Sequence, residues 1–537
     1  MEFDYVIVGG GSAGCVLAAR LTEDPANRVC LLEAGKPDDS ALIHTPAGAA
    51  VMVPFKMHNW GFETVPQAGF HGRCGYQPRG KTLGGSSSTN AMIYIRGRAS
   101  DYDRWAAPVD AGGHGCPGWS WQEVLPYFLK SEHNERLNGA LHAQGGPLNV
   151  ADLRSPNPFG RRFIDAAVQT GFREVSDFNT GDQEGVGHYQ VTQKGGERCS
   201  AARAFLHPAM QRPNLTVLTR AMVLRIQVRG KRASAVEVRH GGADKVVTAR
   251  REVILSAGAL QSPQILMCSG IGPKAHLLEH AIAPLVDAPE VGANLQDHVD
   301  YILNRKHSSL DLFGVSLGGG LRILAEVGRF RRERRGMLTS NFAEVGGFVK
   351  TSPDLSEPDV QFHFVIGMVD NHNRTLHFGH GYSLHACVLN PRSRGALKLV
   401  SANALDAPAI DPGFLSDPDD MATLVRSFRL MRKILDAPAF ASIKGRELYT
   451  AKLRDDDQAG IENAIRERAD TIYHPVGTCR MGSDERSVVD PQLRVRGIAG
   501  LRVVDASVMP QLVSGNTNAA TIMIAEKAAD LIRSAPA

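Results

Sequence analysis

The first 35 residues alternate between short apolar runs and a segment with helical spacing. Tyr5 to Val8 is a fully apolar run, and a second run follows at Val29 to Leu32. Between them, Cys15 to Leu21 carries its apolar residues at the spacing of a helix. The pattern therefore predicts a strand, a glycine-rich turn, a helix and a second strand.

The turn between the first strand and the helix carries a GxGxxG pattern. Its glycines are Gly9, Gly11 and Gly14, with Ser12 and Ala13 between the last two. In this setting, glycines permit a tight turn and bring the backbone and the helix N-terminus close to a pyrophosphate. We therefore expect these five residues to bind a dinucleotide, although a turn that only requires glycine would carry the same letters.

Glu33 directly follows the second apolar run. A carboxylate about 20 residues beyond the glycines commonly accepts a hydrogen bond from a ribose hydroxyl. The same carboxylate would repel a 2′-phosphate, so NADP is disfavoured and NAD and FAD remain.

Four later segments have patterns that complete the predicted α/β organisation. Met222 to Ile226 and Glu252 to Ala259 have the apolar character of strands, the latter closing on small residues. Arg79 to Gly97 starts with basic residues, continues as a Gly/Ser loop and ends in a helix-like segment. Ala519 to Arg533 is predicted to be a helix whose N-cap lies at Thr517 or Asn518.

Composition excludes several classes of protein. The 537 residues are 22% charged and 43% hydrophobic, which excludes disorder, and the length favours two domains. A net charge of +4 is too small for a nucleic-acid-binding surface on a chain of this size, so small ligands are the expected partners.

The eight cysteines are scattered, without a CxxC pair or a Cys/His cluster, so we expect no metal site. They are typical of thiols in a reducing compartment. The N-terminus lacks the basic region of a signal peptide, and no apolar run approaches the ~20 residues of a membrane span. A cytoplasmic location is therefore expected, with peripheral attachment to the inner face of the cell membrane as the alternative.

Six segments in this order resemble the motifs of the glucose-methanol-choline (GMC) family of FAD-dependent oxidoreductases. They are the GxGxxG unit, residues 79–97, 252–273, 291–298 (VGANLQDH), 473–482 (YHPVGTCRMG) and 503–518 (VVDAS through NTN). The resemblance spans Asp4 to Ile532. It implies a Rossmann-like FAD-binding domain of residues 1–147, 193–301 and 471–537, interleaved with a substrate-binding domain of residues 148–192 and 302–470 that combines an antiparallel sheet with helices.

The resemblance also implies where the chemistry takes place. His474 matches the family's acid/base residue, and an imidazole suits the removal of a hydroxyl proton because its ordinary pKa is ~6.5. Asn518 aligns with the partner position, where an amide orients the substrate oxygen but cannot act as base. Asn516 is interpreted mainly as a turn residue.

For the cofactor, the resemblance implies contacts of Gly84, Gly85, Ser86 and Asn90 with the flavin ring, of Val223 with the adenine, and of Asp505 with the ribityl-pyrophosphate region. Relatives with covalent FAD carry a histidine just before the loop asparagine, where this chain has Thr89. Noncovalent FAD is therefore expected.

The implied reaction is oxidation of a primary alcohol to an aldehyde, with hydride transfer to flavin N5 and a quinone-type electron acceptor. The sequences of residues 340–348 and 391–395 resemble both alkanol dehydrogenases and choline dehydrogenases, so they do not separate the two. Choline would require an aromatic cage and a carboxylate, which Glu344 could supply, whereas the main substrate segment contains no tryptophan. An oxidase using O2, a redox-silent hydroxynitrile lyase and a non-catalytic flavoprotein are further alternatives.

Residues Leu321 to Arg335 form a candidate basic amphipathic helix. Six arginines and two glutamates alternate with apolar residues there. Such a helix could rest on an anionic membrane and bring the flavin close to a quinone. A solvated arginine face on a surface helix is the plain alternative.

Overall fold

A seven-stranded sheet forms one half of the molecule, described by a computed structural model for residues 1–535. Its central part is parallel, in the order β10, β2, β1, β13, β25. These strands are β10 (Leu215–Leu218), β2 (Val29–Leu32), β1 (Glu2–Val8), β13 (Ala243–Leu255) and β25 (Leu501–Val503). The predicted strand at residues 29–32 is confirmed, and the predicted strand at residues 5–8 is the second half of β1.

Strand β13 is long enough to serve two arrangements. Its first residues pair antiparallel with β12 (Arg232–His240), which pairs in turn with β11 (Ala221–Arg229). Its last residues pair parallel with β1 and β25. The sequence pattern detected only the apolar end of β13, as a strand closing on small residues within 252–259, and the strand ends at Leu255.

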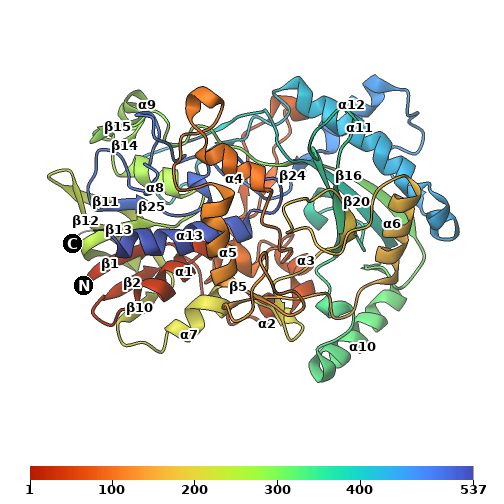
Figure 1. Cartoon of the computed structure of the whole chain (residues 1–537), viewed down its shortest axis with the longest axis horizontal. Coiled ribbons are helices and arrows are strands. Elements are labelled where there is room, and N and C mark those ends of the chain that lie inside the picture. Colours follow the sequence, from red (N-terminus) through yellow and green to blue (C-terminus); the bar gives the residue numbers. More distant parts are fainter. Residues whose placement is uncertain (536–537) are drawn as a thin grey trace.

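Helices α1 (Ser12–Leu21) and α13 (Asn518–Arg533) pack beside each other next to this sheet, with α5 (Trp121–Ser131) against α13 (Figure 1). Both predicted helices are confirmed. Arg20 in α1 forms an ion pair with Glu526 in α13 at 2.7 Å, and the Glu526 side chain is completely buried. The two helices are therefore fixed to each other although some 500 residues separate them.

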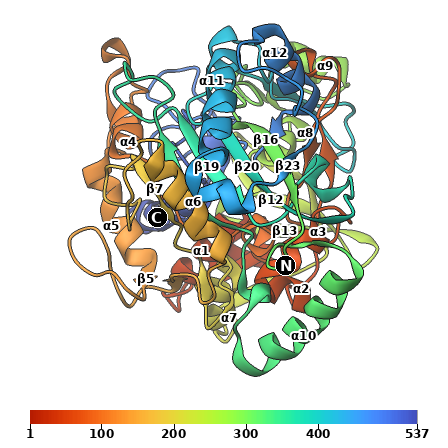
Figure 2. The same ribbon diagram turned by 90° about the vertical axis from the view of Figure 1, so that its right-hand side faces the viewer.

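The second half of the molecule contains an antiparallel sheet of seven strands. Its main strands are β16 (Val299–His307), β18 (Ala343–Val349), β19 (Val360–Val365) and β20 (Gly379–Val388). Helices α6 (Pro158–Gln169) and α11 (Pro418–Leu435) pack against this sheet and share its apolar core (Figure 2).

The remaining elements are short, apart from α10 and α12. The helices are α2 (Ala41–His44), α3 (Ala49–Met52), α4 (Ala99–Ala106), α7 (His207–Ala209), α8 (Ser262–Cys268), α9 (Lys274–Glu279), α10 (Leu317–Glu333) and α12 (Gln458–Arg468). The strands are β3 (Phe62–Glu63), β4 (Tyr76–Gln77), β5 (Glu132–Asn134), β6 (Leu148–Val150), β7 (Gly185–His188), β8 (Gln193–Lys194), β9 (Glu197–Arg198), β14 (Ile271–Gly272), β15 (Val286–Asp287), β17 (Gly314–Val315), β21 (Ala396–Lys398), β22 (Ala409–Asp411), β23 (Arg446–Glu447) and β24 (Asp470–Thr471).

The prediction of a helix-like segment at the end of residues 79–97 is wrong. The Gly/Ser loop forms a single 3₁₀ turn at Gly85–Ser88, and the residues after it are extended or bent. Met92 has a φ of +59°, which breaks any helix there, and Tyr94 N donates to Gln190 O at 2.9 Å instead.

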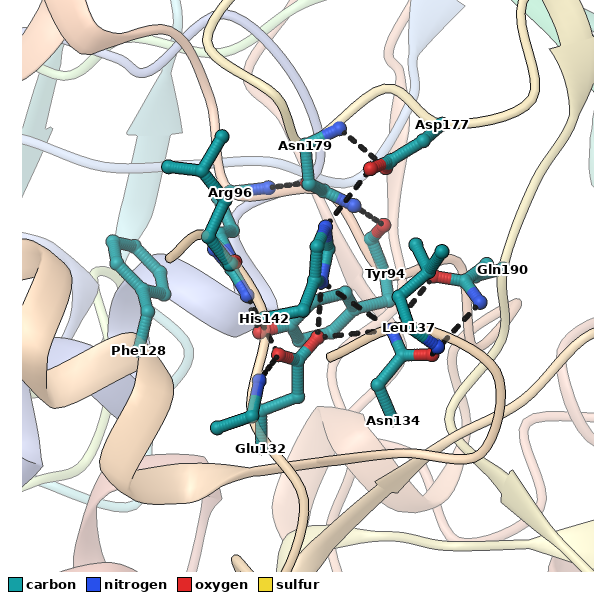
Figure 3. A network of polar contacts seen from close by, with 12 residues as sticks. Tyr94, Arg96, Phe128, Glu132, Asn134, Leu137, His142, Asp177, Asn179 and Gln190 are labelled. Carbon is teal, nitrogen blue, oxygen red and sulfur yellow. Dashed lines mark hydrogen bonds and ion pairs between the residues drawn. The ribbon is translucent and has the colours of Figure 1, made fainter. Parts of the chain in front are cut away.

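A buried polar network joins the loop after residue 93 to two distant segments (Figure 3). Arg96 Nη2 donates to Glu132 Oε2 at 2.9 Å, and both side chains are fully buried. His142 lies between two carboxylates, with Nδ1 at 3.1 Å from Glu132 Oε1 and Nε2 at 2.8 Å from Asp177 Oδ2. The three segments are thereby held together by charge-assisted hydrogen bonds.

Within residues 1–535, no helix combines the length and the apolar character needed to cross a bilayer.

Candidate active site

A single cavity of about 720 Å³ connects the two sheets. One end is lined by the loops that follow the parallel strands, and the other by residues of the antiparallel sheet. All predicted site residues line it except Gly14 and Gly84, namely Gly9, Gly11, Ser12, Ala13, Glu33, Gly85, Ser86, Asn90, Val223, His474, Asp505 and Asn518. Segments far apart in the sequence therefore meet at one site.

The glycine loop shows why two of its positions accept only glycine. Gly9 has a φ of +103°, and a Cβ there would lie 2.5 Å from Ser256 O. A Cβ on Gly14 would lie 1.9 Å from Gly9 O, so Gly14 lets α1 pack on the loop. At Gly11 the closest atom to such a Cβ is Ser256 O at 3.9 Å. Gly11 therefore faces open space, which a ligand can fill.

Glu33 lies at the end of β2, buried beside the glycine loop. Its Oε2 accepts from Gly10 N at 2.8 Å and its Oε1 accepts from Gly35 N at 2.7 Å. Burial raises the pKa of its carboxyl to about 7, although these two amides work in the opposite direction. The side chain thus holds the glycine loop in place as well as facing the cavity.

The Gly/Ser loop packs directly on the glycine loop. Gly84 N donates to Gly10 O at 2.7 Å, and a Cβ on Gly85 would lie 2.7 Å from Gly11 Cα. Asn90 follows the loop, and its Oδ1 accepts from Arg198 Nη1 at 2.8 Å. Arg198 is buried, so it fixes the loop asparagine at the cavity wall.

Asp505 follows β25, and its carboxylate accepts hydrogen bonds from neighbouring residues. Its Oδ2 accepts from Gly258 N at 2.9 Å and from the hydroxyl of Ser262, and its Oδ1 accepts from Ser507 N at 2.8 Å. It therefore shapes the turn after β13, where a Cβ on Gly258 would meet no atom within 4 Å. Ser256 Oγ beside this turn is buried without a hydrogen-bond partner among residues 1–535.

His474 lies where the two sheets meet. Its backbone N donates to Asp297 Oδ1 at 2.8 Å. The preceding residue, Tyr473, has a φ of +76°, a conformation that side chains other than glycine rarely adopt. Arg79 Nη2 donates to Tyr473 O at 2.8 Å, and the Tyr473 hydroxyl lies 2.7 Å from His372 Nδ1. These contacts hold the strained backbone that directs His474 into the cavity.

His298 determines which nitrogen of His474 carries the proton. The two Nδ1 atoms lie 2.9 Å apart, and His298 Nε2 lies 3.0 Å from Leu389 O. A carbonyl only accepts, so His298 Nε2 bears the hydrogen. Burial lowers the pKa of His298 to about 4, so its ring is neutral and its Nδ1 accepts. His474 must then donate from Nδ1, which leaves its Nε2 unprotonated.

The environment also keeps His474 neutral. Burial lowers its pKa well below the ordinary 6.5, and His298, His363 and Arg79 lower it further. No carboxylate side chain forms an ion pair with His474 among the described residues. The arrangement provides a buried neutral imidazole whose Nε2 lone pair lies at the cavity.

Asn516, rather than Asn518, contacts this lone pair. Asn516 Nδ2 lies 3.2 Å from His474 Nε2, and its Oδ1 accepts from Gln361 Nε2 at 3.1 Å. Asn518 is the first residue of α13, and its Oδ1 accepts from the Ser12 hydroxyl at 2.7 Å. Asn518 thus joins the N-termini of α1 and α13 at the cavity, a suitable place for negative charge.

Two further histidines line the cavity beside His474. His363 on β19 and His385 on β20 are register partners, and both are buried. His363 Nδ1 and His385 Nε2 have no hydrogen-bond partner among residues 1–535, whereas His385 Nδ1 lies 2.7 Å from Asp300 Oδ2. These two free nitrogens offer polar contacts that a bound molecule can satisfy.

Several of these residues were missed from the sequence. His298 lies within the segment 291–298 that carried the family resemblance, so its motif was visible although its role was not. Asn516 was interpreted as a turn residue. The contact with Gln361 that distinguishes it from Asn518 spans 155 residues, and no local pattern reveals such a contact.

One cavity thus contains both the glycine loop with Glu33 and the buried His474. Comparison with known sequences identifies the class, because residues 3–300 and 391–525 match the GMC oxidoreductase family. The chain belongs to this family. Its cofactor is FAD, and the open space at Gly11 and Gly258 together with the unpaired Ser256 hydroxyl fits such a ligand.

Individual relatives align over nearly the whole chain. An alcohol dehydrogenase [acceptor] of Pseudomonas putida is 49% identical over 99% of this chain and 95% of its own length. The mitochondrial choline dehydrogenase of Homo sapiens is 42% identical over 100% of this chain and 90% of its own. Among solved structures, pyridoxine 4-oxidase from Mesorbium loti superposes with a TM-score of 0.88 at 32% identity, covering 100% of both chains.

Proposed function

We propose that this protein oxidises a primary alcohol to an aldehyde, with His474 as the base, and passes the electrons to a quinone-type acceptor. The observation that supports this most directly is the proton arrangement at His474. Its Nδ1 donates to neutral His298, so the unprotonated Nε2 lies at the cavity, where Asn516 Nδ2 is 3.2 Å away. When bound, FAD supplies the acceptor for the hydride that leaves the alcohol carbon.

The residues around His474 have complementary roles in this proposal. His474 Nε2 removes the hydroxyl proton of the alcohol, which a neutral imidazole does well near neutral pH. Asn516 Nδ2 carries two hydrogens and donates one of them to the alcohol oxygen, which orients it. The orienting role expected for Asn518 thus suits Asn516 better by position, while Asn518 serves the cofactor end together with Ser12.

The position of Glu344 disfavours choline as the substrate. Ala343 lines the cavity, whereas Glu344, which lies at an irregularity in the pairing of β18 with β19, is absent from the cavity lining. Its Oε2 accepts from Asn157 N at 2.6 Å and its Oε1 accepts from the Ser340 hydroxyl. The carboxylate that a quaternary ammonium would need is therefore directed elsewhere.

Among the described lining residues, Glu33 and Asp505 are the only carboxylates, and both lie at the dinucleotide end. Trp60 does line the cavity although it lies outside the main substrate segment, so the lack of tryptophan there does not decide the matter. Among the described residues, no carboxylate lines the part of the cavity that contains His474, and this favours an uncharged alcohol.

The electron acceptor and the location complete the proposal. We propose that the electron acceptor is a quinone. We also propose that the protein is cytoplasmic and contacts the inner face of the membrane peripherally. Oxidation by O2 is the alternative for the second half-reaction, and cyanohydrin cleavage is the alternative for the whole reaction.

Anaerobic mixing of the holoenzyme with 1-alkanols, choline or a cyanohydrin separates these functions. We expect a 1-alkanol to abolish the visible absorbance of the oxidised flavin, and choline at the same concentration to do so far more slowly. Faster reduction by choline would contradict the substrate class. Cyanohydrin cleavage without any alcohol-dependent loss of colour would contradict the reaction. Mixing the reduced enzyme with O2 or a soluble quinone then compares the acceptors.

A further inference from the structure

Helix α10 exposes the side of the helix that is apolar. Only Gly319 and Phe330 of its 17 residues are buried. Leu317, Leu321 and Leu324 are 86%, 63% and 70% exposed. Their spacing of four and three residues places them on one side of the helix, a stripe that normally packs against a core. Here the stripe faces solvent, and α10 projects from the edge of the molecule (Figures 1 and 2).

This apolar surface continues to the entrance of the cavity. Val315 in β17 precedes α10, forms a backbone bridge with Phe378, and lines the cavity. Phe378 is 79% exposed, and the nearby Leu376 is exposed and also lines the cavity. We call Val315, Leu317, Leu321, Leu324, Leu376 and Phe378 the entrance surface. Contiguous exposed apolar side chains of this kind mark an interaction site.

The second half of α10 adds positive charge on the same side. Arg331 follows Leu324 by seven residues, two helical turns along the same side, and Arg332 is its neighbour. Arg322 pairs with Asp311 at 2.8 Å, and Arg334 pairs with Glu197 at 3.1 Å. Arg331 and Arg332 are exposed and form no ion pair within residues 1–535. Their charge is therefore available to a partner.

We propose that the entrance surface docks on an anionic lipid bilayer, with the leucines of α10 at the acyl boundary and Arg331 and Arg332 at the lipid phosphates. Apolar residues beside unpaired arginines match the two layers of such a membrane. A second copy of this chain fits less well, because a two-fold contact would place the same arginines near each other. The docked orientation opens the cavity toward the lipid phase.

The proposal concerns where the chain binds, and it rests on the proposed function only in that an apolar alcohol or quinone would reach His474 from the lipid.

Helix α10 starts earlier than the sequence predicted, at Leu317, because the Ser316 hydroxyl accepts from Gly319 N at 2.9 Å and caps it. The earlier start adds Leu317, the most exposed leucine of the stripe.

Cosedimentation of the full-length holoenzyme with vesicles tests the proposal. We expect binding to mixed phosphatidylglycerol and phosphatidylcholine vesicles that weakens in high salt, and binding at least about tenfold weaker to phosphatidylcholine alone. Leu321→Glu with Leu324→Glu should abolish binding, and Arg331→Glu with Arg332→Glu should weaken it by about tenfold or more.

Leu278→Glu with Leu285→Glu is the matched control, because both leucines are exposed near α9 at the opposite end of the molecule (Figure 1). The control should bind like the unaltered protein, and all variants should retain flavin reduction by a water-soluble alcohol. Unchanged vesicle binding in the leucine variant, or no binding by the unaltered protein, would overturn the proposal. A dimer that dissociates in the leucine variant would assign the surface to a second copy. Because binding is measured without turnover, failure of the proposed reaction would leave these results standing.

Discussion

Two buried histidines of this protein show how partners decide the role of an imidazole. His142 lies between Glu132 and Asp177 in the network of Figure 3, whereas His474 faces the uncharged His298 and Asn516. Burial works against a charged ring in both places. At His142 the two carboxylates outweigh burial and raise the pKa, whereas at His474 burial lowers the pKa and the neighbouring histidines and Arg79 lower it further.

The difference separates structural and chemical uses of the same side chain. Both nitrogens of His142 are occupied as donors, so the ring holds segments together as a cation. His474 donates from Nδ1 to His298, and its unprotonated Nε2 lies at the cavity beside the neutral amide of Asn516. We therefore expect substitutions at His474 and its neighbours to change reaction rates, and substitutions in the His142 network to change stability.

The largest effect is expected for His474→Ala. Removal of the base should slow flavin reduction by an alcohol by roughly 10² to 10⁴, the usual range for a general base, while FAD stays bound. In the unaltered enzyme the lowered pKa of His474 keeps the ring neutral into mild acid, so the rate should fall only below pH 6.5. Stopped-flow reduction across pH checks both statements, and a rate near that of the unaltered enzyme in the variant would place the base elsewhere.

Substitution of His298 should have the next largest effect. His298→Leu removes the acceptor for His474 Nδ1–H, so the proton can occupy Nε2 and the reactive form becomes scarce. We expect a loss of about 10-fold or more in the rate of reduction. His298→Asn retains an acceptor and should recover most of the rate and the original pH profile. Equal rates in both variants would show that His298 only fills space.

The two asparagines provide a sharper comparison within the site. Asn516→Ala should slow reduction while the pH limb assigned to His474 persists, since orientation is lost and the base remains. Asn518→Ala should chiefly weaken FAD retention during gel filtration, since it contacts Ser12 at the helix N-termini. The reverse pattern would return the orienting role to Asn518.

The smallest expected effect is His142→Gln, which should change stability and leave the rate unchanged. The raised pKa of His142 means that its charge stabilises the fold below pH 6.5, and that this contribution is lost as pH rises through the raised value. The pKa values of Glu132 and Asp177 are lowered, so their contribution is lost in acid.

Thermal melts of the variant should therefore differ most from the unaltered protein near pH 6 and least near pH 9. His71→Gln, at an exposed position directly after the 3₁₀ turn Ala68–Phe70, is the control. A difference in melting temperature that does not vary with pH would contradict a charged His142.

Local pattern predicted the parts of the fold that local physics determines. The strand Val29–Leu32 and the glycine loop could be predicted because a buried parallel strand and a tight turn each restrict several neighbouring residues. The segment after Ser88 was predicted as helix-like, because its propensities do not reveal the distant contacts with Gln190 and Arg198 that hold it open. The division into two interleaved domains stays a prediction.

Sequence motifs predicted which segments contribute to the candidate site, but not how their side chains are arranged. Glu33 follows a glycine pattern whose chemistry is general, so its role could be predicted from the residues themselves, whereas the role of His474 was predicted from the resemblance of its segment to the GMC family. The choice between Asn516 and Asn518, and the side on which Glu344 lies, depend on strand register and on the start of α13. These are tertiary features that a one-residue shift reverses.

The central claim, that His474 removes the hydroxyl proton while the hydrogen on the alcohol carbon leaves as hydride, is tested most directly by anaerobic flavin reduction with an α,α-dideuterated primary alcohol. The account predicts a clear primary isotope effect on the reductive step in the unaltered enzyme, because the carbon–hydrogen bond breaks as the flavin is reduced. Reduction at the same rate with the protiated and the deuterated alcohol, or no reduction by any alcohol, would contradict it.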